Sequence, residues 1–332
     1  MPTKISAPVS TPPKNTATYE YYLRGRYQLY GKFLRSRRES DFQSALNLFH
    51  KAIEIDSNYA LAYAGLAQAF HSQWVFSGFR SQEARDLKFK NASMAVKLDP
   101  ALAEAQNMMA SAYLTKLDFE HAHRTLKIAL TLNPNLADAN YTAGHFMQNL
   151  GLYDQSVKYF YRTIALDPFA LQVYGFSASF LMNLGKLEEA ATQIKRGLEI
   201  EPEFLNHYVA GAELAILTKK YNQADTLIAK AEKIAPNLVA PMKAMLLAAR
   251  GEKEKALALS QEFEVYALLG MKDETIQSLK NRSDEKRSLY LYLLNYPVFA
   301  DLRDDPRFMA LIEKEKKKYE ENLRKYGDLG VE

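Results

Sequence analysis

Prolines recur at a fixed interval through the middle of the chain. Five of the twelve prolines lie 34 residues apart, at Pro100, Pro134, Pro168, Pro202 and Pro236. A proline cannot continue a helix, but it is tolerated at the start of one, where the N–H groups have no intrahelical partners. A repeat period of this length is typical of one supersecondary unit stacked many times. We therefore expect each of these prolines to begin a new unit.

Side-chain size keeps the same register as the prolines. In the stretch before four of these prolines, a small residue is followed four positions later by a large apolar one, so that both lie on one helix face. The pairs are Ala122 with Leu126, Ser156 with Phe160, Ala190 with Ile194, and Ala224 with Ile228. Small residues also recur earlier in each unit, at Ala110, Gly144, Ala178 and Ala212. The pattern predicts two antiparallel helices per unit, joined by turns that are clearest at Gly151 and Gly185.

This pattern resembles the tetratricopeptide repeat (TPR) family, whose unit is a 34-residue helix–turn–helix. The match is most specific across residues 101–236. The resemblance implies an all-α fold, a right-handed superhelical solenoid of about seven to eight helical hairpins with a C-terminal capping helix. The expected array covers residues 18–281, with units at 19–57, 58–100, 101–136, 137–170, 171–204, 205–238, 239–262 and 263–281.

The two ends depart from the repeat. Residues 1–17 are rich in Pro, Ser and Thr and have too few large apolar side chains to offset the entropy of ordering, so we expect a disordered linker. Residues 282–332 end in a helix whose apolar residues cluster at its beginning, which suits a cap over the last hairpin. Two insertions are also expected, a basic loop at 35–38 and a longer loop at 75–82.

Two further stretches narrow the resemblance. The segments YEYYLRGRYQLY (19–30) and YPVFADLRDDPRF (296–308) are similar to the TPR sensor portions of modular bacterial signalling proteins. In such proteins a serine/threonine kinase, a nucleotide cyclase or a winged-helix regulator precedes the repeats. The resemblance implies a non-catalytic scaffold or sensor that binds a protein or peptide partner. The alternative is a regulatory domain of a kinase or cyclase whose catalytic part lies outside this sequence.

Composition and motifs argue against several other functions. The 43 basic and 39 acidic residues nearly balance, so no nucleic-acid partner is expected. The chain has no cysteine, no phosphate-binding loop and no HExxH motif, and we expect no catalytic residue, metal or cofactor. His121 and His123 lie two positions apart, on different helix faces, and are expected at the surface. The arginines of the first unit, among them Arg24 and Arg26, are expected on its outer face, with an acidic lipid or nucleic acid as the alternative contact.

No apolar run reaches the length of a membrane span, so no membrane insertion is expected in this segment. We assign the chain to the cytoplasm by default, with the extracytoplasmic part of a membrane-anchored sensor as the alternative. Exposed repeat ends would also allow a homo-oligomer to form.

The candidate binding residues are those that the repeat register places on the concave side, which the first helix of each unit lines. They are Asn107, Ser111, Tyr141, His145, Gln148, Asn149, Gln172, Ser179, Asn183, Asn206 and Glu213. Their amides carry both donors and acceptors and suit the backbone of an extended peptide. The alternative is a polar groove that holds only water. The Lys and Asn pattern that clamps acidic chaperone tails is missing from these positions, so that partner is not expected.

Overall fold

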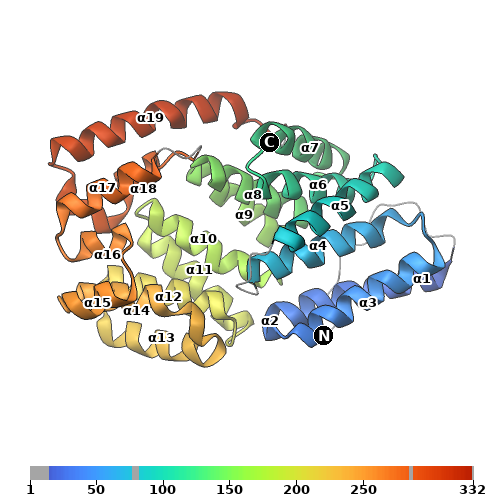
Figure 1. Ribbon diagram of the computed structural model, residues 1–332, viewed down its shortest axis with the longest axis horizontal. Helices are drawn as coiled ribbons and strands as arrows, with labels where there is room; N and C mark the ends of the chain where they lie inside the picture. The colour runs from blue at the N-terminus through green and yellow to red at the C-terminus, as the bar shows by residue number, and fades with distance from the viewer. Residues whose placement is uncertain (1–14, 77–81, 284–286, 331–332) are drawn as a thin grey trace. The chain divides into compact units, whose positions relative to one another are not determined.

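The computed structural model describes residues 15–76, 82–283 and 287–330. All regular secondary structure within these ranges is helical, which confirms the predicted all-α class (Figure 1). The chain divides into two compact units, the first formed by residues 1–146 with 329–332 and the second by residues 147–328. In both units most helices pack against the next helix in the chain.

The first unit contains the N-terminal hairpins. Its helices are α1 (Thr16–Arg26), the π-helix η1 (Tyr27–Phe33), α2 (Leu34–Ser36), α3 (Glu39–Ile55), α4 (Ala60–Phe76), α5 (Gln82–Leu98), α6 (Ala103–Thr115), α7 (Phe119–Leu132) and most of α8 (Ala137–Leu150). The predicted basic loop at 35–38 is wrong in its first half, because the helical segment continues to Ser36 and reverses at Arg37, which has a φ of 54°.

Two predicted irregular segments fall largely outside the described residues. These are residues 1–14 of the expected linker, and residues 77–81 of the expected loop at 75–82. At the edges of these segments the structure is helical, because α1 already begins at Thr16 and α4 continues to Phe76.

The second unit begins with the last turn of α8. It continues with α9 (Tyr153–Leu166), α10 (Leu171–Asn183), α11 (Leu187–Ile200), α12 (Leu205–Leu217), α13 (Tyr221–Ile234), η2 (Pro236–Leu238), α14 (Ala240–Ala249), α15 (Lys253–Leu259), α16 (Phe263–Leu268), α17 (Lys272–Arg282), α18 (Tyr290–Asn295), η3 (Pro297–Leu302) and α19 (Pro306–Tyr326). Each predicted unit from 58–100 to 263–281 contains two α-helices, with η2 as an additional short helix in 205–238 and with α17 ending one residue beyond 281.

Small residues allow the helices to pack closely, as the register predicted. Ala122, Ala190 and Ala224 are fully buried between helices. In the first hairpins the ring of Phe49 lies between Gly25 of α1 and Gly65 of α4, and a Cβ at Gly25 would lie 2.7 Å from that ring. Glycines with positive φ occupy the predicted turns at Gly151 and Gly185. The close approach of backbones is therefore set by the missing side-chain atoms.

The C-terminal helices do more than cover the last hairpin. α19 contacts α17 and α18, and its later residues reach the beginning of the second unit. Asn322 donates to the carbonyl of Leu150 at 2.9 Å, and the Tyr319 hydroxyl donates to Asp154 at 3.3 Å. The second unit is thus connected from its first turn to its last helix.

Candidate partner-binding site

The first helices of the N-terminal hairpins share one small polar cavity. It has a volume of about 30 Å³ and lies within the first unit, between α1, η1, α3, α4, α6 and α8. Its polar lining residues are Tyr22, Arg26, Tyr30, Gln68, Glu104, Asn107 and Asp138. First helices were predicted to carry the binding residues, and Asn107 is the predicted residue that lines this cavity.

An ion pair closes one side of the cavity. Arg26 of α1 approaches Asp138 of α8, with 3.5 Å between Nη2 and Oδ2, and the Tyr30 hydroxyl donates to Asp138 at 3.3 Å. The Arg26 side chain is 18% exposed, so the prediction that it belongs to a charged outer face is wrong. Arg24, by contrast, is exposed and pairs with Glu20. The two arginines lie two positions apart, which places them on different faces of α1.

Asn107 is the unusual residue of this cavity. It is 1% exposed, and neither its Nδ2 nor its Oδ1 atom has a hydrogen-bond partner among the described residues. A buried amide without partners costs free energy, because it has given up its hydrogen bonds to water. Glu104 lies one helical turn earlier and is 8% exposed, and burial raises the pKa of its carboxyl. The cavity therefore offers a donor and acceptors to a polar group that enters it.

Ser111 is another predicted residue, and it is bound to a buried lysine. The Lys88 ammonium donates to the Ser111 carbonyl at 2.7 Å and to its hydroxyl at 2.9 Å, and also to the Thr115 hydroxyl at 2.8 Å. Nδ1 of His71 lies 2.9 Å from the same nitrogen. Lys88 is 1% exposed, and burial holds its pKa well below the usual range.

Lys88 was not among the candidate residues that the repeat register predicted. Its position carries a signal, because it lies on the buried stripe of α5 between Ala84 and Ala92, each four residues away. A lysine on a buried stripe needs acceptors from neighbouring helices, and here α4 and α6 supply them.

Tyr141 and His145 form a ring pair on α8 in the first unit. Their centroids lie 4.5 Å apart in an edge-to-face arrangement, and both side chains are half-buried. Burial raises the pKa of the Tyr141 hydroxyl, and the charge of Asp138 raises it further. Burial lowers the pKa of His71, and the nearby Lys88 and His145 lower it further.

In the second unit, two predicted residues contact the chain's own C-terminal part. Arg287 donates to Oδ1 of Asn149 at 3.1 Å, and the Tyr296 hydroxyl donates to Oε1 of Glu213 at 2.8 Å. Burial raises the pKa of Glu213 to about 7, although the Tyr296 hydrogen bond opposes the shift. The other predicted residues of this unit are half-buried, namely Gln148, Gln172, Ser179, Asn183 and Asn206.

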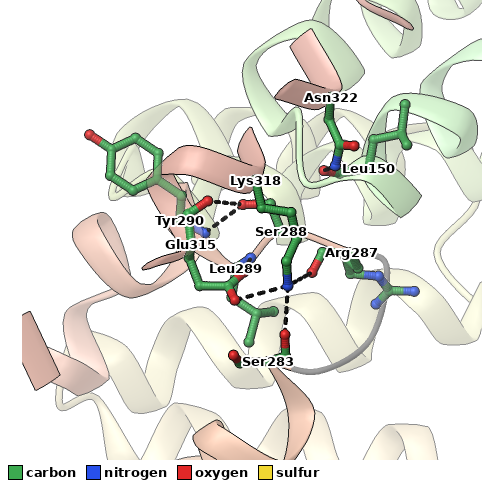
Figure 2. Close-up of polar contacts among 9 residues, drawn as sticks. All are labelled: Leu150, Ser283, Arg287, Ser288, Leu289, Tyr290, Glu315, Lys318 and Asn322. Atoms are coloured by element: carbon green, nitrogen blue, oxygen red, sulfur yellow. Dashed lines mark hydrogen bonds and ion pairs between the residues drawn. The ribbon is translucent and has the colours of Figure 1, made fainter. Parts of the chain in front are cut away.

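A buried carboxylate on α19 fixes the start of that C-terminal part (Figure 2). Oε2 of Glu315, which is fully buried, accepts from the Leu289 N–H at 2.7 Å, and the Glu315 carbonyl accepts from the Ser288 hydroxyl at 2.9 Å. Lys318 pairs with Glu315 at 2.9 Å and donates to the carbonyl of Ser283 at 2.6 Å. Figure 2 shows Leu150 and Asn322 beside this cluster.

The two histidines of α7 have separate partners. Nδ1 of His121 lies 2.8 Å from Asp118, and the His123 ring stacks on Phe146 at 5.8 Å. Over the ranges that the structure describes, no three metal-binding side chains gather in a group that could hold an ion. Across these same residues, no helix has the length and apolar character that crossing a bilayer requires.

Comparisons with known proteins agree with the repeat architecture. Residues 171–204, one of the predicted units, match the family model for the tetratricopeptide repeat. No curated protein matches the chain significantly in sequence. The resemblance to sensor portions of signalling proteins therefore stays a proposal.

Solved structures with similar folds cover most of the chain. The Cut9 and Hcn1 hetero-tetramer of APC/C has 16% identity and a TM-score of 0.57, over 85% of this chain and 53% of that one. The human IFIT1 dimer with PPP-AAAA has 16% identity and a TM-score of 0.53, over 88% of this chain and 70% of that one. A thermophilic TPR protein of Thermus thermophilus has 21% identity and a TM-score of 0.48, over 60% of this chain and 99% of that one. The repeat match at 171–204 and the fold shared with the APC/C and IFIT1 structures together support a tetratricopeptide repeat array in an all-α solenoid fold.

Proposed function

We propose that this chain is a non-catalytic interaction module that binds an extended peptide or protein segment along the first helices of its first unit. The observation that carries the proposal is the buried amide of Asn107, which has neither donor nor acceptor matched within the described residues. A peptide backbone presents an N–H and a C=O at nearly every residue, so one segment can satisfy both atoms.

The charged residues of the cavity suit recognition better than chemistry. Arg26 lies against Asp138, and Tyr30 donates to the same carboxylate, so these groups hold one another in fixed positions. Fixed polar groups lose little entropy when a partner binds, which favours affinity. The Tyr141 and His145 ring pair on α8 adds two more polar side chains to the proposed binding residues of the first unit. We include Gln148, Gln172, Ser179, Asn183 and Asn206 as further proposed contacts along the first helices of the second unit.

A binding measurement on one variant tests the proposal. Peptides selected by the full chain from an array should bind Asn107→Leu at least about tenfold more weakly, because two hydrogen bonds are lost. Asn91→Leu is the matched control, since Asn91 lies on the second helix α5 and donates to its own helix at Leu87. Equal binding by both variants would remove the first-unit cavity from the proposal, as would an array without any binder.

The larger context is a separate proposal. The sequence resemblance of residues 19–30 and 296–308 supports a sensor within a larger bacterial signalling protein, with the regulatory part of a kinase or cyclase as the alternative. The coding sequence upstream of Met1 tests both ideas. An in-frame catalytic module would favour the regulatory domain, and a stop codon just before Met1 would contradict both.

A further inference from the structure

Residues 287–302, comprising α18 and η3, cover acceptor groups of the second unit, and we refer to them as the internal segment. The Arg287 side chain and the Ser288 N–H donate to Asn149 and to the Leu150 carbonyl at the end of α8. The Tyr292 hydroxyl donates to Glu264 of α16 at 2.9 Å. The Tyr296 hydroxyl donates to Glu213 of α12.

These hydrogen bonds all run in one direction. In each of them the internal segment donates, and the repeat helices accept through a carboxylate, an amide oxygen or a carbonyl. Carboxylates accept only, and buried ones need a donor to replace water. The Tyr292 and Tyr296 hydroxyls supply these donors to Glu264 and Glu213. This face therefore selects a segment that is rich in donors.

Aromatic rings supply the apolar part of the contact. Tyr292 and Tyr296 lie one helical turn apart on the same face, with centroids 4.8 Å apart. The ring of Phe263, next to Glu264, lies 6.1 Å from Tyr292 and 6.1 Å from Phe299. Tyrosine combines large rigid contact area with a polar tip, which is how it serves as an anchor in interfaces.

The turns of the repeats leave room for the backbone of the internal segment. Gly151 and Gly185 both have positive φ. A Cβ at Gly151 would collide with the carbonyl of Ser288, and one at Gly185 would lie 3.1 Å from the carbonyl of Asn295. Two successive hairpin turns thus receive the main chain of the same segment.

We infer that the face formed by Asn149, Leu150, Glu213 and Glu264 is a peptide-docking site, occupied by the chain's own residues 287–302 as an internal ligand. An external segment with two tyrosines four residues apart competes for it. The inference is independent of the first-unit cavity, because it concerns other residues and another ligand chemistry.

A labelled peptide of sequence RSLYLYLLNYPVFADL, with a solubilising tail, tests the inference by fluorescence anisotropy on the full chain. Replacing the internal tyrosines by Tyr292→Phe with Tyr296→Phe weakens the internal ligand, so the peptide should bind this variant at least about tenfold more tightly than wild type. Tyr290→Phe is the control, since that ring packs on Tyr319 of α19 at 5.4 Å, and it should match wild type. A peptide in which the tyrosines that correspond to Tyr292 and Tyr296 are replaced by phenylalanine should bind about tenfold more weakly.

A glycine pair gives a second test that leaves the tyrosines in place. Gly151 and Gly251 have φ values of 81° and 79°, so alanine costs similar backbone strain at both. Only at Gly151 would the new Cβ meet the internal segment, since nothing lies within 4 Å of it at Gly251. Gly151→Ala should therefore increase peptide binding, and Gly251→Ala should not. Equal affinity across wild type and all variants, or binding to none of them, would overturn the inference.

Discussion

Replacing Asn107 with leucine should stabilise the first unit while it weakens partner binding. The side chain is fully enclosed, and both of its polar atoms lack partners among the described residues. Leucine has nearly the same branching, removes the unmatched donor and acceptor, and places apolar atoms beside a cavity of about 30 Å³. Since a buried unmatched amide costs about 1–3 kcal/mol, the free energy of unfolding should rise by about that amount.

Urea unfolding followed by circular dichroism measures this change, and hydrogen exchange of the α6 amides localises it to the first unit. Asn140→Leu is the matched control, because Asn140 is equally buried but donates to the carbonyls of Pro134 and Leu136 at 3.0 Å each. That variant should lose about 1–3 kcal/mol. If Asn107→Leu were destabilised as much as Asn140→Leu, the Asn107 amide would have a structural role, and the binding proposal would lose its main support.

Three further predictions concern buried charges and strained turns. Lys88→Met should remove a rise in stability that wild type shows as the pH increases toward 10.5, the ordinary pKa of a lysine. Because burial lowers the pKa of Lys88, the unfolded chain binds more protons below that pH; urea titrations at each pH compare the two slopes. Wild type should lose up to about 3 kcal/mol of stability between pH 4.5 and about pH 7, and Glu213→Gln should remove this loss. The raised pKa makes the folded state bind more protons there, and a wild-type protein without this slope would contradict the assignment. Leu117→Gly should be neutral or stabilising by up to about 1 kcal/mol, since Leu117 is 51% exposed and has a φ of 56°; a melting temperature lowered by several degrees would refute this.

The sequence predicted the hairpins well because their signals are local. Small residues such as Ala122 and Ala190 mark close helix contacts, and Gly151 and Gly185 mark turns in which other residues are strained. The turn at Leu117 shows the limit of this reasoning, because a leucine there adopts the left-handed conformation that glycine favours. In α1–α2 the π-helical stretch carries the helical segment past Arg35, and the chain reverses only at Arg37.

Contacts between distant positions could not be read from the repeat register. Arg26 and Asp138 belong to different hairpins, and each could have faced solvent as well as the cavity. Tyr296 with Glu213 and Arg287 with Asn149 join the irregular C-terminal part to repeats far earlier in the chain. The helix positions of the candidate residues could thus be predicted. Their contact partners could not, because contact with water, a neighbouring helix or the C-terminal part depends on packing beyond one repeat.

The contact of α19 with the end of α8 affects how the second unit folds and unfolds. In a stack whose members contact only their neighbours, terminal repeats can fray one at a time. Here Asn322 and Tyr319 tie the last helix to the first turn of the unit, so fraying from either end breaks the same set of bonds. Melting of this unit should be a single cooperative event. During synthesis on the ribosome, the unit is complete only after the residues of α19, Pro306–Tyr326, have emerged.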